Sequence, residues 1–197
     1  MSPTLYFSII FALSSFLLDD IIFDRIGSGF WSNKTAWNVA LLSDITYGIS
    51  AGIEYTRVEP YTYTHFNRQN SMTHDGMMYG SDILPNSERY TGLLSWWWGG
   101  RYPLKLNISY TRHGENVYDG EGNLIKNVGG DPLQTRRPDD PENVIFLDGK
   151  LQEIFIAELE AGFEIVRGFN IHAIVSMREI NGSSDFGIKT LFRIYDF

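Results

Sequence analysis

Four histidines and several clustered carboxylates are the groups in this chain that could bind a metal or act as acids and bases. His65 and His74 lie nine positions apart, and Asp75 follows the second histidine. Zinc requires ligands that converge with a fixed geometry, and this spacing matches no compact zinc motif. We therefore predict that these side chains make polar contacts within a structured loop, without a metal.

Two kinds of hydrolytic enzyme can be tested against the sequence. His172 and Ser176 are four residues apart on a predicted strand, which separates them by roughly 13 Å and prevents the hydrogen bond that activates a serine. The chain also has no Gly-x-Ser-x-Gly motif. Glu158, Glu160 and Glu164 form a row on one strand face, whereas a glycosidase needs two carboxylates across a cleft. We expect a protein that is not an enzyme.

Composition limits the remaining classes. The 197 residues suffice for one domain with a sizeable core, and we assign residues 1–197 to it. There is no cysteine, so disulfides and thiol chemistry are excluded. A net charge of −8 argues against nucleic-acid binding, and no glycine-rich nucleotide motif is present, so no cofactor is expected. The high aromatic content (15%) and 19 glycines favour β-structure with turns.

Alternation of apolar and polar residues with a period of two predicts the elements that position these groups. One example is the segment 155–165, where apolar residues alternate with the glutamate row. In a closed sheet the glutamates would face inward, and we expect Lys105 or Arg178 to pair with them. The predicted strands are 3–17, 34–43, 46–58, 88–99, 102–113, 149–166, 169–179 and 186–197.

The N-terminal segment MSPTLYFSIIFALSSFLLDD resembles a signal peptide but has no Lys or Arg before Arg25. Its apolar run, residues 5–18, is shorter than the ~20 residues of a transmembrane helix. Leu5, Phe7, Ile9, Phe11 and Leu13 alternate with smaller or more polar residues, so we predict a strand. A helix or an uncleaved signal sequence is the alternative.

Two features favour a transmembrane β-barrel over a soluble β-sandwich. The apolar faces of 47–55 and 102–110 carry tyrosine at both ends, as in the aromatic girdles of outer-membrane strands. Nine tilted residues rise roughly 23 Å, close to the ~25 Å apolar band of such barrels. We place Trp96 and Trp98 of WWWGG in a girdle, with sugar stacking as the alternative.

The connections also alternate in length, which a sandwich does not require. Long segments at 18–33, 59–87 and 114–148 alternate with two-residue turns, so all the short turns fall at one end. The segment 119–143 is rich in Gly, Pro, Asp and Asn and predicts loop throughout. Residues 181–185 form a medium connection with the Asn-Gly signal of a hairpin. We predict an all-β, antiparallel up-and-down transmembrane barrel with about eight strands in this chain.

Three stretches resemble the Wzi-like capsule assembly protein family. They are LLDDIIFDRIGSGFWSNKTAWNVAL (17–41), EYTRVEPYTYTHF (54–66) and SMTHDGMMYGSDILPNSE (71–88). Leu84 stands where the family pattern has glycine before the proline. The resemblance covers residues 17–115. The positions that match the family motif are Glu54, Tyr55, Arg57, Pro60, Tyr63, His65, His74, Gly80, Pro85 and Asn86.

The resemblance implies an outer-membrane barrel of a Gram-negative-type bacterium with extracellular loops. Such a protein would act as a monomeric lectin that anchors capsular or exopolysaccharide at the cell surface and assists capsule assembly. The family barrel has about eighteen strands and a helical plug, so this chain would be its C-terminal portion. That would account for the missing signal peptide, and a complete eight-stranded barrel is the alternative. A solute channel and a barrel-embedded hydrolase are the alternative functions.

Polysaccharide binding requires aromatic faces that stack on sugar rings and polar groups that bond to hydroxyls. Arginine adds recognition of uronic acids. Each loop residue of these types could instead stabilise its loop. The candidate polysaccharide-binding residues are Arg57, Tyr61, Tyr63, His65, Arg68, His74, Asp75, Arg112, His113, Arg136 and Arg137.

Overall fold

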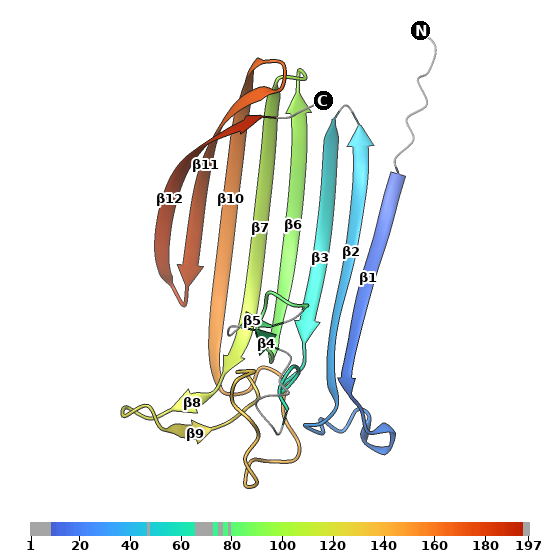
Figure 1. Ribbon diagram of the computed structural model, residues 1–197, viewed down its shortest axis with the longest axis vertical. Helices are drawn as coiled ribbons and strands as arrows, with labels where there is room; N and C mark the ends of the chain where they lie inside the picture. Colours follow the sequence, from blue (N-terminus) through green and yellow to red (C-terminus); the bar gives the residue numbers. More distant parts are fainter. Residues whose placement is uncertain (1–8, 47, 66–72, 75–76, 79, 195–197) are drawn as a thin grey trace.

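The computed structural model describes residues 9–46, 48–65, 73–74, 77–78 and 80–194. Its main element is one eight-stranded antiparallel sheet in which the strand order follows the sequence (Figure 1). All eight predicted strands are confirmed, and their described ends differ from the prediction by up to three residues. The strands are β1 (Ile9–Asp20), β2 (Lys34–Thr46), β3 (Ile49–Val58), β6 (Ser87–Trp98), β7 (Tyr102–Glu115), β10 (Lys150–Val166), β11 (Phe169–Ile180) and β12 (Ser183–Ile194).

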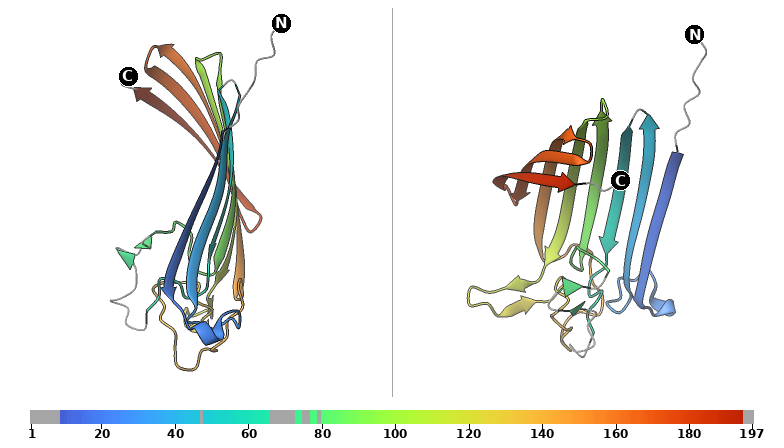
Figure 2. Two further views of the ribbon diagram at one scale, coloured as in Figure 1. Left: turned by 90° about the vertical axis from the view of Figure 1, so that its right-hand side faces the viewer. Right: turned by 45° about the horizontal axis from the view of Figure 1, so that its top comes forward.

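The sheet is open. Within the described residues, β1 pairs only with β2 and β12 pairs only with β11, so the predicted barrel is not closed in this chain. Figure 2 shows a strongly twisted sheet, with β11 and β12 curling out of the plane of the other strands. The confirmed part of the prediction is therefore the antiparallel up-and-down sheet, and the correction is its open form.

The connections are sorted by length as predicted, except that the two-residue turn after β11 lies on the same side as the long segments. The long segments after β1, β3 and β7 all lie at one end of the sheet, here called the long-loop end (Figure 1). The turns after β2, β6 and β10 lie at the other end, the short-turn end. Small elements interrupt the long segments: a 3₁₀ turn, η1 (Phe23–Arg25), and two hairpins, β4 (Thr73–His74) with β5 (Met77–Met78) and β8 (Val117–Tyr118) with β9 (Leu124–Lys126).

Two connection predictions are corrected. The segment 119–143 is not loop throughout, because β9 lies within it and pairs with β8. The connection 181–185 is a two-residue turn at Asn181 and Gly182, both with positive φ (49° and 83°), and β12 begins at Ser183. Ser183 and its neighbours resemble turn residues by composition, but their pairing with β11 places them in the sheet.

One face of the sheet is apolar and has aromatic residues at both ends. Toward the long-loop end, Tyr55, Tyr90, Tyr110 and Phe155 stand opposite one another on four successive strands. The rings of Tyr55 and Tyr90 are 4.8 Å apart. Aliphatic residues follow, including Ile53, which is 64% exposed. This face is called the apolar face.

A second aromatic row closes the apolar face near the short-turn end. Trp98 lies opposite Tyr102, with ring centroids 5.5 Å apart, and Tyr102 stacks on Phe163 at 5.4 Å. Trp96 is on the same face and its ring is 6.1 Å from that of Trp98. The paired placement of Trp96 and Trp98 agrees with the predicted row, while Tyr47 lies outside the described residues.

The pairing register decides which face each side chain of the two outer strands occupies. In β1, Phe11 stands opposite Leu42, which places the odd-numbered residues on the face opposite the apolar one, called the polar face. The even-numbered residues, such as Phe16, continue the apolar face. Because β1 is apolar on both sides, its periodicity could not decide this, and the register with β2 does. In β12, Phe186 and Ile188 occupy the apolar face.

The polar face carries the predicted glutamate row, but with other partners. Glu160 Oε1 lies 2.6 Å from Arg193 Nη1 and 2.6 Å from His172 Nδ1, so one carboxylate links β10, β11 and β12. Neither Lys105 nor Arg178 forms an ion pair with it among the described residues. Gly162 makes room for the buried imidazole, because a Cβ there would lie 2.7 Å from His172 Cε1. This cluster lies among the strands that curl.

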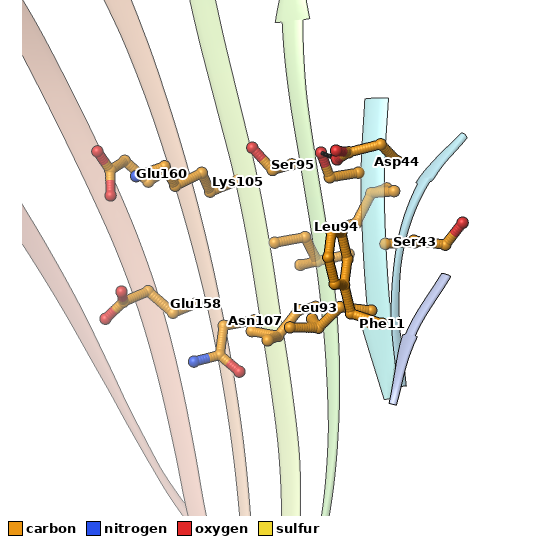
Figure 3. A pocket seen from close by; sticks show the side chains of 15 residues that line it. Phe11, Ser43, Asp44, Leu93, Leu94, Ser95, Lys105, Asn107, Glu158 and Glu160 are labelled. Atoms are coloured by element: carbon orange, nitrogen blue, oxygen red, sulfur yellow. Dashed lines mark hydrogen bonds between the residues drawn. The ribbon is translucent and has the colours of Figure 1, made fainter. Parts of the chain in front are cut away.

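A cavity of about 470 Å³ interrupts the polar face near its middle (Figure 3). Phe11 of β1 and Leu93 of β6 both line it, and Glu158 and Glu160 stand at its opposite side. Gly52 contributes to its floor because a Cβ there would come within 2.4 Å of the Leu42 side chain. The polar face therefore contains an apolar region, formed mainly by residues of β1, β2, β3 and β6.

Candidate functional site

The described loop residues at the long-loop end, 21–33, 59–65, 80–86 and 116–149, are joined by hydrogen bonds and here called the loop module. Tyr61 and Tyr63 lie at its centre with 0% and 1% of their surface exposed. Both have positive φ (61° and 70°), a conformation that costs free energy for a residue with a large side chain. Tight packing must therefore hold this segment in place.

Tyr61 joins two loops. Its amide donates to the Gly129 carbonyl at 2.9 Å, and its hydroxyl donates to the Asn127 carbonyl at 3.1 Å. Gly129 is required at this approach, because a Cβ would lie 2.5 Å from Tyr61. Burial, followed by the nearby Asp140 carboxylate, raises the pKa of Tyr61. The phenol stays neutral and acts as a structural donor.

Asp140 is the buried acceptor of the loop after β7. It receives bonds from the Arg137 amide (2.8 Å), Arg137 Nε (3.0 Å) and Asn127 Nδ2 (3.0 Å). Arg137 also donates to the Leu124 carbonyl at 2.8 Å, which ties this turn to β9. The guanidinium of Arg136 donates to the Asp140 carbonyl. One carboxylate thus organises residues 124–140.

Trp31 links the first loop to the other two. The Arg136 guanidinium lies 5.0 Å from its ring centroid and the Lys34 ammonium lies 5.6 Å away, both in cation–π geometry. The edge of Tyr61 packs against it at 6.0 Å. Lys34 Nζ also donates to the Thr64 carbonyl at 2.6 Å. Cations, aromatic rings and backbone therefore converge around one indole.

Asp19 and Asn86 anchor the loop after β3 at its two ends. Asp19 accepts the Tyr63 amide at 3.1 Å and pairs with His65 Nε2 at 3.1 Å. Asn86, with φ 57°, donates to the carbonyls of Gly114 (2.9 Å) and Asp148 (3.1 Å). These bonds fix the Pro85–Asn86 motif of the resemblance, and the neighbouring Leu84 is 44% exposed.

Charged residues continue the strands beyond the aromatic row of the apolar face. Glu88 accepts from Arg112 Nε at 2.8 Å and from the Tyr55 hydroxyl at 2.7 Å. Arg57 pairs with Glu59 at 2.6 Å and lies 3.7 Å above the ring of Phe146. The order along the strands is therefore aliphatic, aromatic and then ionic.

The predicted binding residues divide by their environment. Tyr61, Tyr63 and His113 are buried, and His113 Nδ1 lies 2.7 Å from Ser87 Oγ, so these three brace the loops and present little surface to a polymer. Binding by them would require the loop module to open. Arg68 and Asp75 lie outside the described residues, as does the side chain of His74, whose backbone belongs to β4. The remaining candidates, Arg57, His65, Arg112, Arg136 and Arg137, are half-buried.

Sequence reasoning missed the residues that hold the module together. Asp19, Trp31, Asn127 and Asp140 are not among the predicted binding residues, most of which are basic or tyrosine. A usable signal was present for Asn127 and Asp140: short polar side chains in Gly- and Pro-rich loops commonly satisfy backbone donors. Among the described residues there is no group of three His, Asp or Glu side chains that could hold a metal.

Comparison with known proteins found no matching family model, no similar curated protein and no similar solved structure. None of the helices among the described residues is long and apolar enough to cross a membrane. The function must therefore be argued from the arrangement of residues described above.

We expect Asp140→Ala to destabilise the loop module by about 2 kcal/mol, because the Arg137 donors and Asn127 lose their charged acceptor. Hydrogen exchange of the amides in residues 124–140 measures the change. Asp139→Ala is the matched control, since Asp139 is exposed and accepts none of these bonds. Equal protection in the two variants would contradict the central role of Asp140.

The loop after β3 should open in acid. Bidentate hydrogen bonds from Arg89, at 2.6 and 2.8 Å, hold the pKa of Asp82 below its ordinary 3.8. Because the pKa of Asp82 is lower in the folded loop than in the unfolded chain, its ion pair stabilises the loop at any pH above the unfolded-state pKa. This stabilisation is lost as the pH falls through the folded-state pKa. We expect pepsin cleavage within residues 80–86 to increase across that range.

Asp82→Asn is the control for this acid step. In this variant the loop should be weakly attached at every pH, so pepsin cleavage within residues 80–86 should no longer increase as the pH falls. Asp148, whose pKa is also lowered, mainly by its hydrogen bond with Lys126, lies in the loop after β7. An unchanged acid step in Asp82→Asn would show that another group controls the loop.

Proposed function

We propose that the sheet is a section of the wall of an outer-membrane β-barrel and that its long-loop end binds an exported polysaccharide at the cell surface. The observation that carries the first part is the order of side chains on the apolar face. Two aromatic rows, at Tyr55–Tyr90–Tyr110 and at Trp98–Tyr102, flank a band of exposed aliphatic residues. Water disfavours so large an apolar surface, whereas a bilayer with its two interfaces matches each row.

The position of the loops supports the outward orientation. All three long segments lie at the end where ionic residues follow the aromatic row, and outer-membrane barrels place their long loops outside. The polar face would then line the interior. The ion cluster of Glu160, His172 and Arg193 fits such an interior, because charged groups facing lipid would be costly.

Polysaccharide binding is the function that the loop module supports best. Its cross-linked backbone provides a rigid base, and a rigid site loses less entropy when a polymer binds. His65, in the module, and Arg112, at the adjoining end of β7, present polar atoms at the surface, with side chains 32% and 38% exposed. These side chains are the proposed contacts, while Tyr61 and Tyr63 support them from below.

The membrane assignment is tested by two adjacent residues of β7. Ile108 belongs to the aliphatic band of the apolar face and Asn107 to the polar face. We expect Ile108→Arg to destabilise the protein folded in lipid by about 2–4 kcal/mol, and Asn107→Arg to cost much less. Urea unfolding in lipid vesicles measures both. Equal costs, or a native protein that stays dissolved and folded without detergent, would contradict the proposal.

The binding assignment is tested by retention of purified capsular polysaccharides, neutral and uronic-acid-containing, on the detergent-folded protein. We expect His65→Ala and Arg112→Ala each to weaken retention about tenfold, the effect of one hydrogen bond to a charged group. Arg101→Ala is the control, because Arg101 is exposed at the short-turn end. Equal retention by all variants would contradict the roles of His65 and Arg112. Ion conductance in planar bilayers without retention would favour a channel.

A further inference from the structure

We infer that a polar cleft beneath the loop after β3 is a subsite for one neutral or amino sugar; this inference rests on the proposed function. The cleft has a volume of about 430 Å³, within the range of about 300–1,000 Å³ of small-molecule sites. It lies on the polar face near the long-loop end, apart from the apolar cavity of Figure 3. The residues that define the cleft are Ser15, Asn38, Glu54, Thr56, Ser81, Asp82 and Arg89.

Two strands, β2 and β3, supply a chain of hydrogen bonds on the floor of the cleft. Asn38 Nδ2 donates to Thr56 Oγ1 at 2.8 Å, and Thr56 Oγ1 donates to Glu54 Oε1 at 3.3 Å. This chain fixes the amide and carboxylate orientations in advance. Glu54 Oε1 also pairs with Arg89 Nη2 at 3.8 Å. Within the described part of the chain, no hydrogen bond engages the side-chain oxygen Oδ1 of Asn38, Glu54 Oε2 or the Ser15 hydroxyl. These atoms remain available to a ligand.

The loop after β3 supplies the roof. Asp82 is held by the bidentate bonds from Arg89, and Ser81 Oγ is fixed by bonds to and from the Ile83 backbone at 3.1 and 3.2 Å. Gly80, with φ 93°, lets the chain turn over the strands. Arg89 Nε is buried and has no partner among the described residues, so the guanidinium has an unused donor.

The chemistry of the cleft selects its ligand class. It presents hydroxyls, an amide, two carboxylates and a guanidinium, which together donate and accept hydrogen bonds as the adjacent hydroxyls of a sugar require. Its formal charge is −1, from Glu54, Asp82 and Arg89. An anionic uronic acid would meet repulsion from two carboxylates. A bare metal cation would meet the guanidinium and only two carboxylates.

This charge balance differs from that of the surface contacts. His65 and Arg112 can interact with an acidic polymer, whereas the cleft favours a sugar without a carboxylate. A polymer that engages both would alternate neutral or amino sugars with acidic ones. The cleft therefore adds selectivity for sugar type to the general affinity of the loop surface.

The test uses the detergent-folded full chain and three probes at pH 7: methyl glucoside, glucosamine and glucuronic acid. Saturation-transfer NMR measures binding. We expect millimolar binding of methyl glucoside and glucosamine, and at least tenfold weaker binding of glucuronic acid. Asn38→Ala should weaken methyl glucoside binding at least tenfold. Glu54→Gln keeps the shape of the cleft and removes one carboxylate. It should therefore reduce the difference in affinity between methyl glucoside and glucuronic acid.

Glu158→Gln is the matched control, since it removes a carboxylate from the same face outside the cleft. It should leave binding of all three probes unchanged. Glucuronic acid binding best, or Asn38→Ala and Glu54→Gln behaving like Glu158→Gln, would overturn the inference. If none of the probes binds while capsular polysaccharide is still retained, the sugar subsite fails and the proposed function stands. If retention fails as well, both fail.

Discussion

The cross-strand register is the constraint on which the rest of the structure depends. Side chains alternate between the two faces of a strand, so a slip of one residue would exchange the faces of that strand. The register places Tyr55 opposite Tyr90 and Tyr90 opposite Tyr110. The same register brings Asn38 opposite Thr56 on the other face. The aromatic row and the polar cleft are thus consequences of one pairing pattern.

The loop module follows a different requirement, the satisfaction of buried backbone groups. A loop that packs against other loops cannot use water for its donors and acceptors. Asn86, Asn127 and Asp140 replace the missing partners with short polar side chains. The aromatic residues Tyr61 and Tyr63 then fill the space between the connected backbones. The module is therefore held by both polar bonds and aromatic burial.

Much of the sheet could be predicted from the sequence, because alternation and turn residues are local signals. The eight strands and the sorting of loops follow from them. The face of β1 could not be predicted, because Phe11 and Phe16 make both sides apolar and only pairing with β2 decides. The open form of the sheet also depends on long-range pairing, about which local alternation gives no information.

The candidate site was less predictable for a related reason. Residue type identifies what a side chain can bind, but burial decides what it does bind. Tyr61 and Asp140 have chemistry suited to a ligand, yet Tyr61 is hydrogen-bonded to the loop after β7 and Asp140 to donors of its own loop. Tyr61 and its hydrogen-bond partner Asn127 are 66 positions apart in the sequence, and no local pattern encodes that contact. The polar cleft, built from four strands and a loop, is nonlocal in the same way.

The even number of strands has a geometric consequence for the two edges. β1 runs from the short-turn end to the long-loop end, and β12 runs in the opposite direction (Figure 1). Strands added at either edge can therefore continue the antiparallel alternation, and any even number of them inserted between β12 and β1 would close the sheet without reversing which end carries the loops. Strands can therefore be added in pairs, as hairpins. Each added hairpin would widen the sheet without changing the position of the aromatic rows along the strands or the end that carries the long loops.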